Sequence, residues 1–234
     1  MSSKDNPLII ALDLKWSDAL DLAKSLDPNT CRLKIGSQLF TSVGPESVRK
    51  LNSLGFDIFL DLKFHDIPNT VQKAIRSAIN LDVWMLNVHI SGGREMLLAA
   101  VEECNKSKRK PLLIGVTLLT SLEEPSMEEV GISLGIKDHV LKLAKLSSHL
   151  GLDGVVCSPN EIKYLRKEMG DKFVLVTPGI RSNSNPKDDQ KRTSTALEAL
   201  SSGANYIVIG REITSKENPS QEVNKILKEI YDLD

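Results

Sequence analysis

The sequence has 234 residues, with 30 Lys and Arg against 31 Asp and Glu, so that its formal net charge is −1. Apolar residues make up 41% and charged residues 26%, close to the soluble globular average, which excludes a disordered or fibrous chain. The balanced charge argues against a nucleic-acid partner, because such binders carry a basic excess that displaces counterions from phosphates.

The cysteines and the apolar runs indicate a cytoplasmic protein. Cys31, Cys104 and Cys157 are far apart in the sequence and offer neither metal-ligand spacing nor an even-numbered disulfide framework. The first apolar run, 8–12, is too short for a signal-peptide core. The longest uncharged stretch, 111–122, falls short of the ~18 residues that a membrane span needs. We therefore expect no association with a membrane.

Short apolar runs bounded by turn residues follow one another along the chain and predict strands. They cover residues 8–14, 31–36, 57–64, 83–90, 112–119, 154–159, 173–180 and 206–213. Charged segments with apolar residues at helical spacing, such as Val71, Ile75 and Ile79, lie between them. Strand and helix alternating in this way predict parallel strands joined by crossover helices. Eight such units in about 250 residues are typical of a closed (β/α)8 TIM barrel.

An open doubly wound sheet is the alternative fold, but it more often carries a glycine-rich phosphate turn after the first strand. Here the first strand is followed by Asp13-Leu14-Lys15-Trp16, which contains no glycine. The long step between the fifth and sixth runs predicts an extra short helix within 121–135. Because no linker or low-complexity tract interrupts the series, we expect residues 1–234 to form one domain.

Charged residues inside two of the predicted strands mark a candidate site. Lys34 lies within the second run, Asp61 and Lys63 lie within the third, and Asp66 follows closely. Burying an unpaired charge is costly, so we expect these two cations and two anions to neutralise one another. They could be a structural network that joins the second and third strands. Because buried ion pairs stabilise less well than apolar packing, a functional cluster is favoured.

Side chains alternate between the two faces of a strand, and this predicts which residues of the third run share a face. Asp61 and Lys63 are two residues apart and should project together. Leu60, Leu62 and Phe64 should then point toward the helices.

A second candidate cluster lies at the ends of the last two runs. The seventh run ends at Thr177-Pro178-Gly179-Ile180-Arg181 and the eighth contains Gly210-Arg211. In barrels of this kind the loops after strands 7 and 8 commonly bind phosphate, and an Arg fork suits that anion. The polar segment 182–190 is either a lid over the phosphate or a plain solvated connection.

Other polar residues give weaker signals. His65 and His89 end the third and fourth runs without partners at metal-ligand spacing, so we expect structural roles for them and no metal site. Thr120 is placed to donate a hydrogen bond to a ligand. Cys157 ends the sixth run but has no persuasive partner for nucleophilic catalysis.

The segment Asp61-Leu62-Lys63-Phe64-His65-Asp66-Ile67-Pro68-Asn69-Thr70 resembles the D-x-K-x-x-D-I-P-x-T motif of the orotidine 5′-phosphate decarboxylase family. Further similar segments follow the family's order and distances: ALDL with Asp13, LKIG with Lys34, VTLLTS with Thr120, TPGIR with Arg181, and IGRE with Arg211. Related phosphosugar enzymes share the D-x-K-x-x-D core alone. The IPNT continuation and Lys34 favour the decarboxylases.

The resemblance implies cofactor-independent decarboxylation of orotidine 5′-phosphate to UMP, the last step of de novo pyrimidine nucleotide synthesis. Lys63 would donate a proton to C6 of the pyrimidine, and Asp61 would lie against the departing carboxylate. Lys34 and Asp13 would hold the ribose hydroxyls and orient the charged network.

The resemblance also assigns the remaining substrate contacts. Thr120 would bond the amide edge of the pyrimidine. The phosphate end would be bound or enclosed by a set that comprises Pro178, Arg181, Gln190, Gly210 and Arg211. Asp66 and Thr70 would reach into the neighbouring subunit's site, which implies a homodimer with shared active sites.

Three alternatives stay open. A metal-dependent phosphosugar decarboxylase, aldolase or epimerase could use the same barrel, although it needs a further carboxylate for Mg²⁺ where Lys34 stands. A non-catalytic nucleotide-binding protein is the second. The third is a Schiff-base mechanism at Lys63, which the neighbouring carboxylates oppose because it requires a neutral amine.

Overall fold

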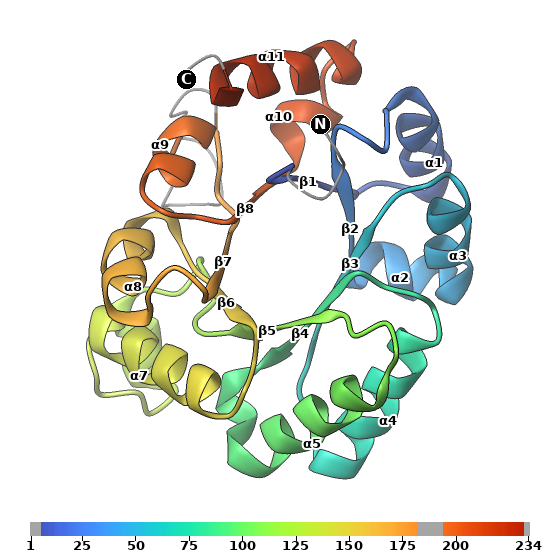
Figure 1. Ribbon diagram of the computed structural model, residues 1–234. Helices are drawn as coiled ribbons and strands as arrows, with labels where there is room; N and C mark the ends of the chain where they lie inside the picture. Colours follow the sequence, from blue (N-terminus) through green and yellow to red (C-terminus); the bar gives the residue numbers. More distant parts are fainter. Residues whose placement is uncertain (1–5, 182–193, 232–234) are drawn as a thin grey trace.

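The structure is a computed structural model that describes residues 6–181 and 194–231. Its strands form a closed, all-parallel barrel in chain order, with helices around the outside (Figure 1). β1 pairs with β8 as well as with β2, which excludes the open sheet and confirms the predicted (β/α)8 TIM barrel. The strands are β1 (Leu8–Ala11), β2 (Arg32–Gly36), β3 (Ile58–Phe64), β4 (Met85–His89), β5 (Leu112–Val116), β6 (Gly154–Val156), β7 (Val174–Thr177) and β8 (Tyr206–Ile209).

The helices of the described residues fill the segments between the strands. They are α1 (Trp16–Ser25), α2 (Ser37–Val43), α3 (Pro45–Ser53), α4 (Pro68–Ile79), α5 (Gly93–Lys106), α6 (Glu124–Glu129), α7 (Ile136–His149), α8 (Ile162–Met169), α9 (Ala196–Ser201), α10 (Arg211–Thr214) and α11 (Pro219–Tyr231), with the 3₁₀ helices η2 (Ile90–Gly92) and η3 (Pro159–Glu161). The extra helix predicted within 121–135 is α6. None of the described helices combines the length and the apolar character that a membrane crossing requires. The extent of the domain, 1–234, stays a prediction.

Helix α4 shows how the sequence produces these elements. Pro68 occupies the first turn, where its missing N–H costs nothing and its fixed φ suits the helix. Val71, Ile75 and Ala78 then recur at helical spacing and are all buried. The helix thereby packs one apolar face against the barrel.

Most strands end before the apolar runs that predicted them. The predicted strand over 206–213 is wrong beyond Ile209, because Gly210 leaves the extended conformation (φ −112°, ψ −105°) and Arg211 starts α10. Asp13 likewise follows β1 rather than belonging to it. The carboxyl ends of the runs therefore form loops at one end of the barrel, which is where sites lie in this fold.

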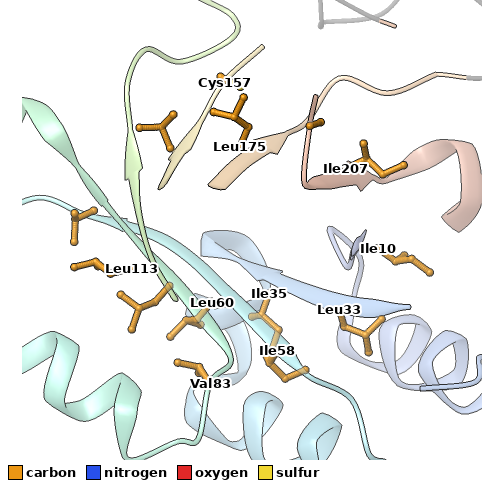
Figure 2. Packing of buried hydrophobic residues seen from close by; sticks show 14 of the residues in the cluster. Ile10, Leu33, Ile35, Ile58, Leu60, Val83, Leu113, Cys157, Leu175 and Ile207 are labelled. Carbon is orange, nitrogen blue, oxygen red and sulfur yellow. The ribbon is translucent and has the colours of Figure 1, made fainter. Parts of the chain in front are cut away.

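The core has two layers that follow the alternation of side chains along the strands. The layer between strands and helices includes Ile10, Leu33, Ile35, Ile58, Leu60, Leu113, Leu175 and Ile207 (Figure 2). The barrel interior contains a separate cluster: Ile9, Ala11, Phe59, Met85, Ile114, Val176 and Val208. Leu62 and Phe64 pack against the outer layer, as predicted from the sequence.

Candidate active site

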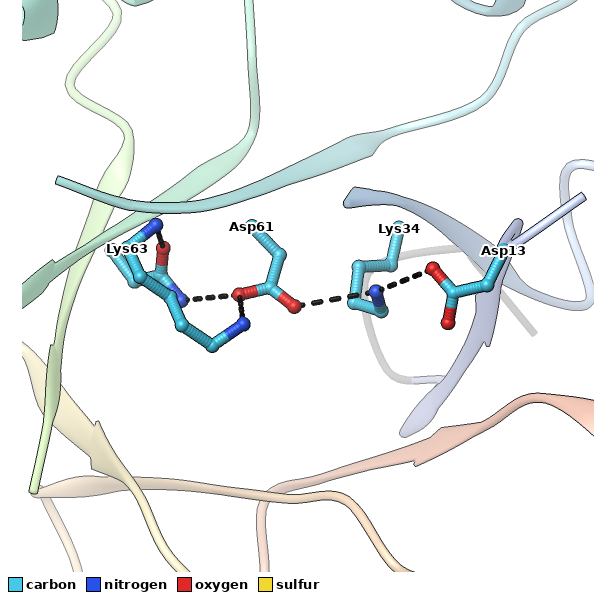
Figure 3. A network of polar contacts seen from close by, with 5 residues as sticks. Asp13, Lys34, Asp61 and Lys63 are labelled. Carbon is cyan, nitrogen blue, oxygen red and sulfur yellow. Dashed lines mark hydrogen bonds and ion pairs between the residues drawn. The ribbon is translucent and has the colours of Figure 1, made fainter. Parts of the chain in front are cut away.

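Four charged side chains, one just after β1 and three in β2 and β3, form a continuous series of ion pairs (Figure 3). Lys34 Nζ lies 3.3 Å from Asp13 Oδ1 and 3.2 Å from Asp61 Oδ2. Lys63 Nζ donates to the other oxygen of Asp61, Oδ1, at 2.7 Å. Carboxylate and ammonium groups therefore alternate from Asp13 to Lys63.

Burial and charge act in opposite directions at the centre of this series. Only 10% of the Lys34 side chain and 12% of the Asp61 side chain are exposed. Burial disfavours the charged form of Lys34, but the carboxylates of Asp61 and Asp13 overcome this and raise its pKa above the usual value. Burial likewise opposes ionisation of Asp61, but Lys34 and Lys63 hold its pKa below the usual value. Both groups are charged at neutral pH.

Lys63 is the more exposed of the two lysines in this series of ion pairs. Its side chain is 35% exposed, compared with about a tenth for Lys34 and Asp61. Its backbone has φ +52°, an uncommon value for a residue other than glycine. The pairing of β3 with β4 is irregular at this point. Strained backbone of this kind clusters at functional sites.

A cavity of about 430 Å³ opens beside the series of ion pairs at the carboxyl ends of the strands. The structure brings nine predicted site residues to its wall: Asp13, Lys34, Asp61, Lys63, Thr120, Pro178, Arg181, Gly210 and Arg211. The apolar residues Ala11, Phe59, Val176 and Val208 of the barrel interior also line it. The cavity therefore places the lysines of β2 and β3, Arg181 after β7 and Arg211 at the start of α10 around one space.

Two predicted residues do not line the cavity within this chain, and a third cannot be placed. Asp66 is exposed and its carboxylate accepts a hydrogen bond from the backbone N–H of Ile67 at 2.6 Å. Thr70, in the first turn of α4, is exposed as well. Gln190 lies outside the described residues. The sequence suggested that Asp66 would be the second anion paired with the two lysines. The structure has Asp13 in that role instead.

Asn87 is a site residue that sequence reasoning missed. It lies in β4, is completely buried, and donates from Nδ2 to Asp61 Oδ1 at 2.7 Å. The sequence held a signal, because Asn87 is an amide in the middle of a mostly apolar run and shares the inward phase of Met85. Thr214 of α10 also lines the cavity, and no sequence signal pointed to it.

The remaining candidates lie near the site or are inert. The rings of His65 and His89 are 5.4 Å apart, and burial, His65 and Lys63 lower the pKa of His89. Burial raises the pKa of the Cys157 thiol to about 12, which suits a packing role. In 6–181 and 194–231, no three His, Cys, Asp or Glu side chains are grouped so that they could hold a metal ion.

A closed parallel (β/α)8 barrel with charged residues and a cavity at the carboxyl ends of its strands belongs to the class of barrel enzymes. A family model described as "Orotidine 5'-phosphate decarboxylase / HUMPS family" matches residues 6–226. The chain belongs to this family.

Individual relatives match over almost their whole length. The orotidine 5′-phosphate decarboxylase of Aliivibrio salmonicida is 49% identical over 95% of this chain and 96% of its own. That of Vibrio cholerae is 49% identical over 95% of this chain and 99% of its own. The crystal structure of orotidine 5′-phosphate decarboxylase from Lactobacillus acidophilus superposes with a TM-score of 0.87 at 35% identity, covering 97% of this chain and 100% of that one.

Proposed function

We propose that this chain decarboxylates orotidine 5′-phosphate to UMP without a cofactor, as the last step of de novo pyrimidine nucleotide synthesis. It is a carboxy-lyase of the family, and the relatives named above carry the decarboxylase name. The observation that most supports a mechanism is the Lys63 ammonium, held 2.7 Å from Asp61 in the wall of the cavity.

The chemical difficulty is a carbanion with no adjacent electron sink. When the bond between C6 and the carboxylate breaks, CO₂ leaves and the electron pair stays on C6. A preorganised ammonium beside C6 stabilises that charge without reorganisation of solvent. Lys63 then transfers a proton from Nζ to C6, which gives UMP, and regains a proton from water.

Asp61, Lys34 and Asp13 keep this ammonium in place. Asp61 is assigned the position next to the substrate carboxylate, where two lysines compensate its charge. The resemblance assigns Lys34 and Asp13 to the ribose hydroxyls, and both line the cavity as a pair at 3.3 Å. A Schiff base at Lys63 would require its Nζ to give up the ion pair with Asp61 at 2.7 Å.

Binding at the far end of the substrate contributes to the chemical step in this mechanism. Arg181, Gly210 and Arg211 line the cavity just after β7 and β8, where barrels commonly bind phosphate. Pro178 lines the same wall, Thr120 is assigned to the pyrimidine edge, and Gln190 is proposed for the phosphate from the resemblance alone. Phosphate binding of this kind can lower the barrier at a remote reacting carbon.

We also propose a homodimer in which Asp66 and Thr70 complete the partner's site. Their exposure within one chain, with Ile67 between them 66% exposed, supports a surface that meets another subunit. A cytoplasmic location and the absence of nucleic-acid and membrane partners stay predictions.

The test is a spectrophotometric assay of orotidine 5′-phosphate after exhaustive dialysis against EDTA. We expect undiminished turnover to UMP. Activity that EDTA abolishes and Mg²⁺ restores would instead favour a metal-dependent enzyme. UMP binding with no turnover in any buffer would favour a non-catalytic nucleotide-binding protein.

Lys63→Ala tests the assigned role of the ammonium. We expect kcat to fall at least about 10³-fold, because general acid catalysis and electrostatic stabilisation are removed together. Affinity for UMP, measured by calorimetry, should be retained, since the product carries no developing charge at C6. Near-normal kcat in this variant would remove Lys63 from the mechanism.

A further inference from the structure

The ladder between β3 and β4 is interrupted beside the reactive lysine. The two strands pair at Leu60 with Leu86 and again at Phe64 with Val88. Four steps along β3 (64 − 60) therefore correspond to two along β4 (88 − 86), so that residues 61–63 lie opposite Asn87 alone. Bulges of this kind re-aim side chains and leave backbone groups outside the regular ladder.

Asn87 provides the hydrogen-bond partner that the interrupted ladder requires. The backbone N–H of Lys63 donates to Asn87 Oδ1 at 2.8 Å. A buried backbone N–H needs a partner, and here a side chain supplies it in place of the neighbouring strand. The same residue has the left-handed φ of +52°, so this bond holds Lys63 in a conformation that the chain does not adopt by preference.

The nitrogen of the Asn87 amide binds Asp61, which is the ion-pair partner of Lys63. Nδ2 of Asn87 donates at 2.7 Å to Oδ1 of Asp61, which also accepts from Lys63 Nζ at 2.7 Å. The three residues thus form a closed ring of three hydrogen bonds that joins both ends of Lys63 to Asp61. Asn87 itself is completely buried and is not among the residues that line the cavity.

We propose that Asn87 is a positioning residue for the reaction: it fixes the Asp61 carboxylate and aims the Lys63 ammonium without touching the substrate. Because it acts through Lys63, this role rests on the proposed decarboxylation. The geometry calls for an amide, since one group must accept from a backbone N–H and donate to a carboxylate at once. A leucine of similar shape does neither.

The first test compares Asn87→Leu with Val88→Ala. Val88 is the next residue of β4, is equally buried, and belongs to the outer layer of the core, so its variant is a matched control for lost stability. We expect Asn87→Leu to lower kcat about 100-fold per folded molecule, the order that a misplaced catalytic group costs. Its affinity for UMP should stay within about threefold of the wild type. Val88→Ala should lose stability and keep kcat.

Asn87→Asp gives a readout that a purely structural role would not produce. The ionised carboxylate accepts from the Lys63 N–H but cannot donate to Asp61. The protonated carboxyl can do both, as the amide does. We therefore expect kcat of this variant to rise as pH falls, relative to the wild type at each pH. Rescue at low pH would support positioning through the bond to Asp61.

Two results would overturn the assignment: a kcat of Asn87→Leu within about threefold of the wild type, or a loss confined to KM. The assay of the wild type distinguishes a failure of the role of Asn87 from a failure of the proposed decarboxylation. If wild-type protein does not decarboxylate orotidine 5′-phosphate, the proposed function fails. Hydrogen exchange at the backbone amide of Lys63 then tests whether Asn87 holds this amide. Faster exchange in Asn87→Leu than in Val88→Ala would support the ring of hydrogen bonds, and equal exchange would contradict it.

Discussion

Lys34 and Gly36 show how a charged group fits into the wall of a barrel. Lys34 is held between two carboxylates, and this offsets the cost of removing its ammonium from water. The space for the pair with Asp13 comes from Gly36. A Cβ at that position would lie 3.0 Å from Asp13 Oδ1 and 3.1 Å from Lys34 Nζ. The absence of a side chain at Gly36 is therefore part of the site.

Gly36→Ala should weaken the pair of Asp13 and Lys34 without straining the backbone, because Gly36 has φ −90°. We expect kcat/KM to fall about fivefold, equivalent to about 1 kcal/mol for a partly exposed ion pair. Gly135→Ala is the matched control: Gly135 also precedes a helix with negative φ, and its Cβ would make only an ordinary contact at 3.5 Å. Identical kinetics for the two variants would contradict this role of Gly36.

At the scale of elements, the pair of Lys34 and Asp61 links β2 to β3. The raised pKa of Lys34 and the lowered pKa of Asp61 have opposite consequences for the dependence of stability on pH. The contribution of Asp61 is present above its unfolded value of about 3.9 and is lost as pH falls through the lower folded pKa. That of Lys34 is present below about 10.4 and is lost as pH rises through the higher folded pKa.

We therefore expect two separate losses in urea unfolding measured across pH. Relative to that of Asp61→Asn, the free energy of unfolding of the wild type should fall in acid, below about pH 3.9, and again in alkali, above about pH 10.4, because this variant lacks both the titrating carboxyl and a carboxylate that raises the pKa of Lys34. Relative to Lys34→Met it should fall in the same two ranges, because this variant lacks both the titrating ammonium and a cation that lowers the pKa of Asp61. Differences that stay constant from acid to alkali would show that neither charge is linked to folding.

Close packing at β5 and β6 depends on two glycines. β6 begins at Gly154, and a Cβ there would lie 2.0 Å from the backbone oxygen of Val174 in β7. At Gly115 of β5 a Cβ would instead meet the side chain of Ile90, at 2.6 Å. A side chain can move aside more readily than a paired backbone.

Gly115→Ala should accordingly lower the free energy of unfolding by about 1–3 kcal/mol, the usual cost of overpacking. Gly154→Ala should cost more than about 4 kcal/mol or prevent folding, because β6 and β7 must separate. Chemical denaturation followed by circular dichroism measures both. Equal costs at the two positions would contradict the distinction between backbone and side-chain contacts.

What could be predicted from the sequence follows from these same physical causes. Apolar runs and their spacing predicted the barrel, and the charges of Lys34, Asp61 and Lys63 were visible because barrel strands are otherwise apolar. The predicted ends of β2 and β3 were correct, but most strand ends were not predictable. Gly210, for example, ends β8 through a backbone conformation that its identity permits but does not require. The bulge opposite Asn87 was missed because a two-residue change of register leaves the alternation pattern unchanged.

At the scale of the whole molecule, the barrel separates stability from chemistry. The apolar interior cluster and the outer layer hold the strands together, and the charged residues gather where the strands give way to loops. Two residues of the motif over 61–70 lie away from the cavity, because Asp66 and Thr70 are exposed on the surface of their own chain. A second subunit would give these residues a site to complete.

Mixing two inactive variants tests this arrangement. Lys63→Ala and Asp66→Asn should each be inactive as a homodimer, because every site then lacks one essential group. In the mixed dimer one site combines both substitutions, and the other receives an intact Lys63 from one subunit and an intact Asp66 from the other. Random exchange makes half of the dimers mixed, so about a quarter of the wild-type sites should be restored. Activity should appear after the subunits are dissociated and reassociated together. If the reassociated mixture is no more active than the two variants assayed separately, Asp66 acts in its own chain or not at all.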